Sequence, residues 1–120
     1  MAAACEQAFR INSADPDNLG ASRLELDSAG SVRSVPIDKL ISADVNFIKI
    51  DVEGMEMEVL EGAAGLIQRW RPKLMVEVAK ENRSQFLQWL ETNSYAINRE
   101  FIYVNATNIM VAPKSEKSNA

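Results

Sequence analysis

The residues best suited to chemistry lie in the stretch NFIKIDVEGMEMEVLEGA, which covers residues 46–63. Five acidic side chains follow one apolar segment, namely Asp51, Glu53, Glu56, Glu58 and Glu61. Clustered carboxylates repel one another, so the cluster either belongs to a functional site or forms the solvent-exposed face of a helix. Carboxylates at a site can accept a proton, hold a divalent cation or bind substrate hydroxyl groups.

The two interpretations apply to different residues of the cluster. Glu58 and Glu61 have helix-surface spacing, which favours a solvated face. Asp51 and Glu53 instead end an apolar strand. An acidic side chain there either loses its hydration at a cost in free energy or has a functional role. Glu56 enters the first turn of the next helix, where the helix dipole favours negative charge. We therefore expect Asp51, Glu53 and Glu56 to belong to a site.

Strands and helices alternate around this cluster. Apolar and β-branched residues predict a strand over 45–52, covered on both faces, and a second buried strand over 73–78. Apolar residues at three- and four-residue steps predict a helix from Met55 to Trp70. A second helix is predicted over 82–95, capped by Asn82 or Ser84.

The two ends of the chain have different patterns. Residues 2–9 suit one or two helical turns, whereas residues 22–26 and 31–37 alternate apolar with polar and predict a β-hairpin. Residues 96–103 and 107–113 predict an antiparallel strand pair. We therefore expect one α/β domain over 1–113 with a mostly parallel sheet, and a disordered tail over 114–120.

A parallel sheet would bring two acidic residues together. Asp51 and Glu77 each end one of the two predicted parallel strands, and neighbouring strands lie about 4.8 Å apart. Ligands of such sheets bind beyond the carboxyl ends of the strands. Gly54 between Glu53 and Glu56 suits a tight turn or the close approach of a ligand. This rim of the sheet is the predicted site.

Composition excludes several other kinds of site. The 120 residues contain no histidine and one cysteine, Cys5, which excludes an intrachain disulfide, a Cys/His zinc site and a histidine-dependent triad. The net charge is −4 with scattered basic residues, which disfavours nucleic acid as a partner. No apolar run reaches the roughly 18 residues of a membrane span, so we expect a cytoplasmic protein.

The block FIKIDVEGMEMEVLEGA, followed by Pro72 and KLMVEV, resembles the C-terminal half of the FkbM-type methyltransferase family. That family has an apolar strand, then D-V-E-G-x-E, then V-L-x-G-A. The segments VPIDKL and NLGASRL are also similar to it, so the resemblance extends from Asn18 to Pro113. It implies a Rossmann-like class I fold and S-adenosylmethionine-dependent methylation of hydroxyl groups on sugars, polyketides or similar small molecules.

The resemblance also assigns roles to residues. Asp51, Glu53, Gly54 and Glu56 would line the active-site edge after one strand, and Glu77 would follow the next. Asp51 and Gly54 would face the methyl donor, and some related methyltransferases hold a magnesium ion at this edge. The chain departs from the family in lacking G-x-G-x-x-G after a strand, so the principal donor-binding half is missing.

Three functions are compatible with these observations. The chain is the catalytic-edge half of an O-methyltransferase, weak or inactive alone, or a non-catalytic ligand-binding or dimerisation module derived from that fold. A carboxylate hydrolase using Asp51 and Glu77 is a third alternative, although no aromatic sugar platform accompanies the pair. The missing half would leave the 45–52 strand with a free edge, which predicts a homodimer or capture of that edge by residues 1–26.

Overall fold

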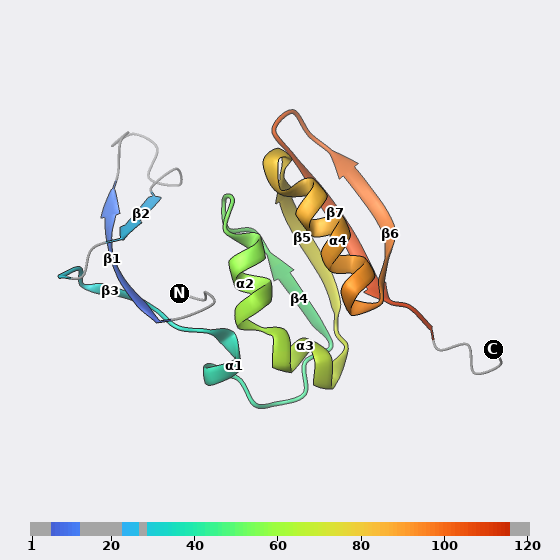
Figure 1. The fold of residues 1–120 in the computed structure, drawn as a ribbon, viewed down its shortest axis with the longest axis horizontal. Coiled ribbons are helices and arrows are strands. Elements are labelled where there is room, and N and C mark those ends of the chain that lie inside the picture. Colours follow the sequence, from blue (N-terminus) through green and yellow to red (C-terminus); the bar gives the residue numbers. More distant parts are fainter. Residues whose placement is uncertain (1–5, 13–22, 27–28, 116–120) are drawn as a thin grey trace.

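The computed structural model describes residues 6–12, 23–26 and 29–115 of the chain. They form a small sheet near the N-terminus and a larger sheet that carries the helices (Figure 1). The strands of the small sheet are β1 (Gln7–Asn12), β2 (Arg23–Leu26) and β3 (Val32–Ser34). Those of the large sheet are β4 (Phe47–Ile50), β5 (Lys73–Ala79), β6 (Tyr95–Ile102) and β7 (Ala106–Pro113).

The small sheet corrects the expected hairpin. Its strand order is β2-β1-β3, so β2 and β3 both pair antiparallel with β1 and not with each other. The helical turns predicted over 2–9 are wrong where the structure describes the chain, because β1 begins at Gln7. Alternating polarity identifies a strand but does not choose its partner. The expected capture of the free edge by residues 1–26 is also wrong for the described residues, because β1 and β2 pair in a sheet separate from β4.

The large sheet is mixed. Its strand order is β4-β5-β7-β6, with β4 parallel to β5 and the other two pairings antiparallel. The antiparallel pair at the C-terminal end is confirmed, and β4, β5 and β6 run in one direction while β7 runs against them. The short connection between β6 and β7 explains the reversal of β7, because only a long crossover can join parallel neighbours.

Four helices accompany the large sheet: α1 (Ile37–Leu40), α2 (Glu56–Gly62), α3 (Ala64–Trp70) and α4 (Arg83–Asn93). The single predicted helix from Met55 to Trp70 divides at Ala63, which ends α2 and precedes α3. A 3₁₀ turn, η2 (Lys80–Asn82), joins β5 to α4. None of the helices in the described part of the chain is long and apolar enough to cross a membrane.

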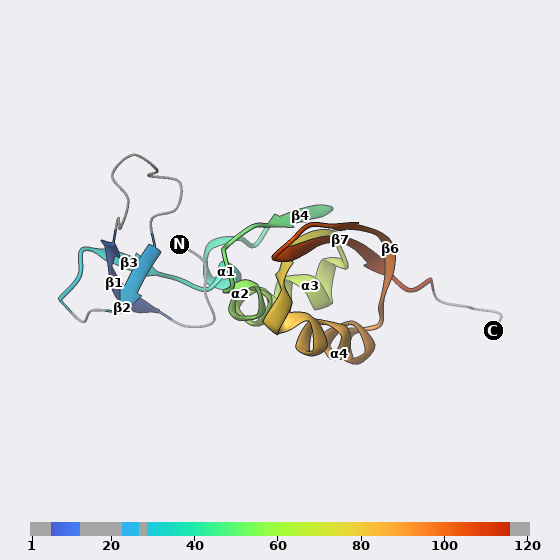
Figure 2. The same ribbon diagram turned by 90° about the horizontal axis from the view of Figure 1, so that it is seen from above.

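The helices α2, α3 and α4 cover one face of the large sheet (Figure 2). The core therefore lies between that face and the helices, where Leu74, Val76 and Val78 of β5 are buried with Leu60 and Phe86 of the helices. On the opposite face Phe47 of β4 is 49% exposed. The prediction that the 45–52 strand is covered on both faces is thus wrong within the described residues.

A carboxylate from α1 caps α3. Asp38 accepts hydrogen bonds from the backbone N–H groups of Gly65 and Leu66, both at 2.8 Å. These two N–H groups belong to the first turn of α3, where no partner within the helix is available. A Cβ atom on Gly65 would lie 2.9 Å from Oδ2 of Asp38, so this cap requires glycine.

We predict that the effect of Gly65→Ala depends on its partner. In the natural protein the new Cβ displaces Asp38, and the lost cap costs about 1 kcal/mol, which offsets the gain in helix propensity, so the free energy of unfolding should change little. In an Asp38→Ala background the same change should raise it by up to about 1 kcal/mol, because alanine is the better helix former. Urea denaturation followed by circular dichroism measures both, and equal effects in the two backgrounds would refute the cap.

Candidate functional site

The turn between β4 and α2 has an uncommon backbone conformation. Val52 accepts a hydrogen bond from the N–H of Met55 at 3.4 Å, and the two residues between them have positive φ, 53° for Glu53 and 95° for Gly54. Positive φ at both central positions defines a type I′ turn. Glycine adopts it freely, whereas for glutamate it is strained. A Cβ on Gly54 would meet no atom within 4 Å, so glycine is needed for the backbone and not for space.

Glu56 joins this turn to the end of β5. Its side chain is fully buried, and its Oε2 atom accepts hydrogen bonds from the Ala79 N–H and the Asn82 amide, both at 2.8 Å. The same Asn82 nitrogen donates to the carbonyl of Gly54 at 3.1 Å. The Oε1 atom is buried and has no hydrogen-bond partner among the described residues. Glu56 therefore positions the rim, and its predicted catalytic role stays a prediction.

Asp51 and Glu77 meet as predicted for neighbouring parallel strands. The register places Ile50 beside Val76, so the next residue of each strand reaches the same rim. The two carboxyl groups are hydrogen-bonded, and this bond is the largest cause of a raised pKa of Glu77. Desolvation and repulsion from Asp51, Glu53 and Glu56 also raise the pKa of Glu77.

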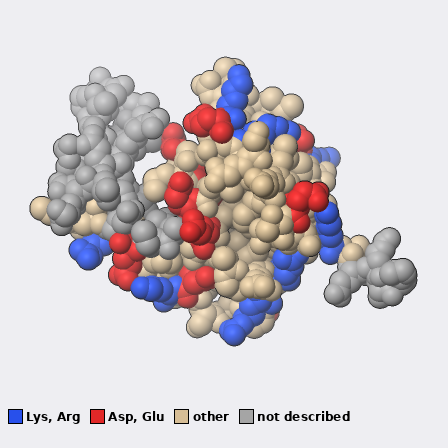
Figure 3. All heavy atoms as spheres, in the orientation of Figure 1, with Lys and Arg blue, Asp and Glu red and all other residues tan. Residues whose placement is uncertain are grey.

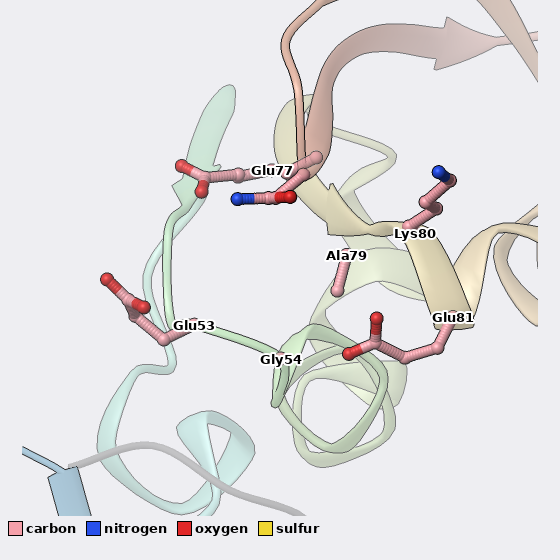
Figure 4. Close-up of a pocket in the computed structure, with 8 residues that line it drawn as sticks. Glu53, Gly54, Glu77, Ala79, Lys80 and Glu81 are labelled. Atoms are coloured by element: carbon pink, nitrogen blue, oxygen red, sulfur yellow. The ribbon is translucent and has the colours of Figure 1, made fainter.

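A cavity of about 360 Å³, which we call the rim cavity, opens beside this pair. Figure 4 shows the carboxylates of Glu53 and Glu77 on one side of it and Lys80 and Glu81 on the other. The residues that line it are Glu53, Gly54, Glu77, Ala79, Lys80, Glu81, Asn105 and Ala106. Its abundant acceptor oxygens suit hydroxyl groups and disfavour anions.

The other acidic residues behave as a solvated helix face. Glu58 and Glu61 are exposed on α2, where acidic side chains gather in Figure 3. Within the described residues, no three His, Cys, Asp or Glu side chains form a group that could hold a metal ion. Magnesium therefore rests on the family resemblance alone.

Sequence reasoning missed part of the rim. Lys80 and Glu81 directly follow β5. Ligands bind beyond the carboxyl ends of the strands, so including two more residues after β5 in the predicted site would have found them. Asn105 reaches the rim through the pairing of Ala79 with Ala106, which no local pattern shows. Asn82 stands at the cap position of α4 as predicted, but its side chain makes no cap hydrogen bond and binds Glu56 and Gly54 instead.

We predict that Glu77→Gln stabilises the protein at neutral pH. A raised pKa means that the folded state holds this proton more tightly than the unfolded chain does. The stabilising contribution is therefore complete below the ordinary value of 4.5 and is lost as pH rises through the folded value. Glutamine removes this loss, so the variant should be more stable than the natural protein at pH 7 and lose its advantage near pH 4.

Urea denaturation across this pH range measures the difference. The matched control is Glu81→Gln, which alters an exposed glutamate of the same cavity. The same pH dependence in both variants would contradict the raised pKa of Glu77.

Comparison with known proteins agrees with the predicted resemblance. The family model for the methyltransferase FkbM domain matches residues 4–103. The solved structure of methyltransferase FkbM from Methylobacillus flagellatus KT is similar over 89% of this chain, with a TM-score of 0.54 and 22% identity. The chain spans only 26% of the length of that protein. No curated protein matches. The match over most of its residues shows that the chain belongs to the FkbM methyltransferase family.

Proposed function

We propose that this chain supplies the acceptor side of an S-adenosylmethionine-dependent O-methyltransferase that modifies a hydroxyl group of a small molecule. The observation that carries the proposal is the meeting of Asp51 and Glu77 at the ends of the paired strands β4 and β5, where Glu77 and Glu53 line the rim cavity. Family membership supplies the reaction class and the cofactor. The carboxylate hydrolase alternative receives no comparable support.

Each carboxylate of the rim has a distinct part in this proposal. The donor, when bound, supplies an electrophilic methyl group. The acceptor hydroxyl donates a hydrogen bond to Asp51 or Glu53, which orients its oxygen for attack. As the new carbon–oxygen bond forms and the sulfur–methyl bond of the donor breaks to leave a neutral thioether, the hydroxyl proton passes to Asp51 or Glu53. Glu56 keeps the turn in place by its contacts with Ala79 and Asn82.

The described residues fit one wall of a donor site. Open space surrounds the Cβ direction of Gly54, so a ligand can approach the backbone there. The five glycines of the chain do not form the glycine-rich turn that cradles the donor in related proteins. Asp51 and Gly54 would contact the donor from this wall alone, and the chain by itself should bind it weakly.

Titration with S-adenosylhomocysteine, followed by the amide NMR shifts of the 120-residue chain, tests this proposal. We expect shifts confined to residues 51–54 and no saturation at micromolar ligand. Asp51→Asn should abolish them, whereas Glu58→Gln, on the exposed face of α2, should preserve them. Shifts centred away from the rim would contradict the function, and micromolar saturation would contradict weak binding by this part alone.

A second candidate, an assembly module, is favoured by the outer edge of β4. Asn46 accepts a hydrogen bond from the N–H of Lys73 at 2.9 Å, so its backbone faces β5. Backbone groups of alternate residues point to opposite edges of a strand, which directs those of Phe47 and Lys49 outward. Among the described residues β4 has no other neighbour, and an unpaired edge invites pairing. We propose a second copy of the chain as the partner.

Light scattering of the purified chain should therefore give the mass of a dimer. Lys49→Pro removes the outward N–H without removing a bond to β5, and we expect it to yield monomers. Lys49→Ala keeps that N–H and should remain dimeric. A strictly monomeric natural chain would refute the assembly.

A further inference from the structure

A second cavity, of about 610 Å³, lies at the ends of α3 and α4, and we call it the basal cavity. Arg71 and Ser94 on its wall follow these helices and come shortly before β5 and β6, so the cavity lies at the opposite end of the strands from the rim (Figure 1). The residues that line it are Gln68, Arg71, Thr92, Asn93, Ser94, Pro113 and Lys114. Two of them are cationic and none is acidic, so this cavity favours an anion where the rim cavity disfavours one.

The two cationic residues meet at one atom, the carbonyl oxygen of Ser94. The guanidinium of Arg71 donates a hydrogen bond to this oxygen at 2.9 Å, and the backbone N–H of Lys114 donates another at 2.9 Å. Arg71 and Lys114 are thus neighbours in space although they lie far apart in the sequence. Neighbouring positive charges repel each other, and an anion bound between them relieves this repulsion.

The Arg71 side chain is held in place before any ligand binds. Its guanidinium carbon lies 4.6 Å from the centre of the ring of Tyr95, which is buried. The Tyr95 hydroxyl donates a hydrogen bond of 2.7 Å to the carbonyl of Pro72, so the ring is fixed as well. A guanidinium has several N–H donors in one plane, and the bond to Ser94 uses one of them. The remaining donors suit the paired oxygens of an oxyanion.

The helix ends beside the cavity do not cancel this preference. The C-terminal end of a helix carries about half an elementary negative charge, which comes from carbonyl groups without partners. Several of these carbonyls have donors here, because the N–H of Arg71 binds Ile67 at 2.9 Å and the Asn93 amide binds Trp89 at 2.9 Å. The full charges of Arg71 and Lys114 therefore outweigh the partial charges of the two helix ends.

One acidic side chain lies near the cavity without lining it. The carboxylate of Glu91 lies 3.7 Å from the ammonium group of Lys114, and the two side chains are 80% and 47% exposed. An ion pair as exposed as this one contributes little free energy. A bound anion can therefore replace Glu91 beside Lys114, and Glu91 acts as its competitor.

We propose that the basal cavity binds the phosphate group of a small molecule. A phosphate group carries up to about two negative charges and several acceptor oxygens, which match Arg71, Lys114 and the hydroxyl groups of Thr92 and Ser94. A carboxylate has less charge and fewer oxygens and would leave some of these donors free. The volume of the cavity is that of a small-molecule site, and the net charge of −4 disfavours nucleic acid.

Inorganic phosphate is the probe that tests this inference on the 120-residue chain. We expect saturable amide NMR shifts at Arg71, Ser94 and Lys114, at constant ionic strength with chloride as the balancing anion. Acetate should bind at least about tenfold more weakly than phosphate, because it offers less charge to the same two cations.

Three variants and a matched control locate the phosphate. Arg71→Gln should lower the affinity at least about tenfold and Lys114→Gln about threefold. Glu91→Gln should raise the affinity about twofold, because it removes the competing carboxylate. The control is Arg69→Gln, which removes an exposed cation of α3 outside the cavity and should change nothing. The Lys114 and Glu91 side chains are exposed, so these two variants report on binding even if Arg71→Gln disturbs the fold.

Absence of saturable shifts, equal affinity for phosphate and acetate, or an effect of Arg69→Gln as large as that of Lys114→Gln would overturn the inference. Weaker binding by Glu91→Gln would also overturn it. The inference does not depend on methyl transfer, because S-adenosylhomocysteine reports on the rim and phosphate reports on the basal cavity.

Discussion

One buried carboxylate, that of Glu56, holds the candidate site together. Removing a charged group from water is costly unless hydrogen bonds compensate, and here Ala79 and Asn82 donate two to the same oxygen. Asn82 also binds the carbonyl of Gly54, so the strand-to-helix turn and the end of β5 form one rigid rim. The strained turn conformation of Glu53 is thereby supported on its C-terminal side, at Gly54 and Glu56.

The acidic cluster is therefore three groups with three physical functions. Glu56 is buried and holds the turn in place, Glu58 and Glu61 face water, and Asp51 lies beside Glu77 at the rim and raises its pKa. Their sequence spacing is similar, and only their surroundings differ. The parallel pairing of β4 with β5 brings Asp51 beside Glu77, whereas the antiparallel pairing of β5 with β7 brings the apolar tip of the β6–β7 hairpin to the same end of the sheet.

Local periodicity predicted most elements of the large sheet. The meeting of Asp51 with Glu77 could also be predicted, because the carboxyl ends of neighbouring parallel strands lie at the same edge of the sheet. Periodicity could not predict pairings between distant segments, which is why β1 was missed as the centre of the small sheet. The burial of Glu56 was equally invisible, since its donors lie 23 and 26 residues later in the chain. Asp38 escaped notice for the same reason, as it caps a helix 27 residues away.

Hydrogen exchange of the Ala79 amide tests the central claim, that Glu56 locks the turn to β5, most directly. A hydrogen bond to a charged group contributes about 1.5 to 3 kcal/mol, so Glu56→Ala should speed exchange at Ala79 by roughly 10- to 100-fold. Exchange at Val76, in the middle of β5, should change far less. Unchanged exchange at Ala79, or an equal increase at both amides, would contradict the account.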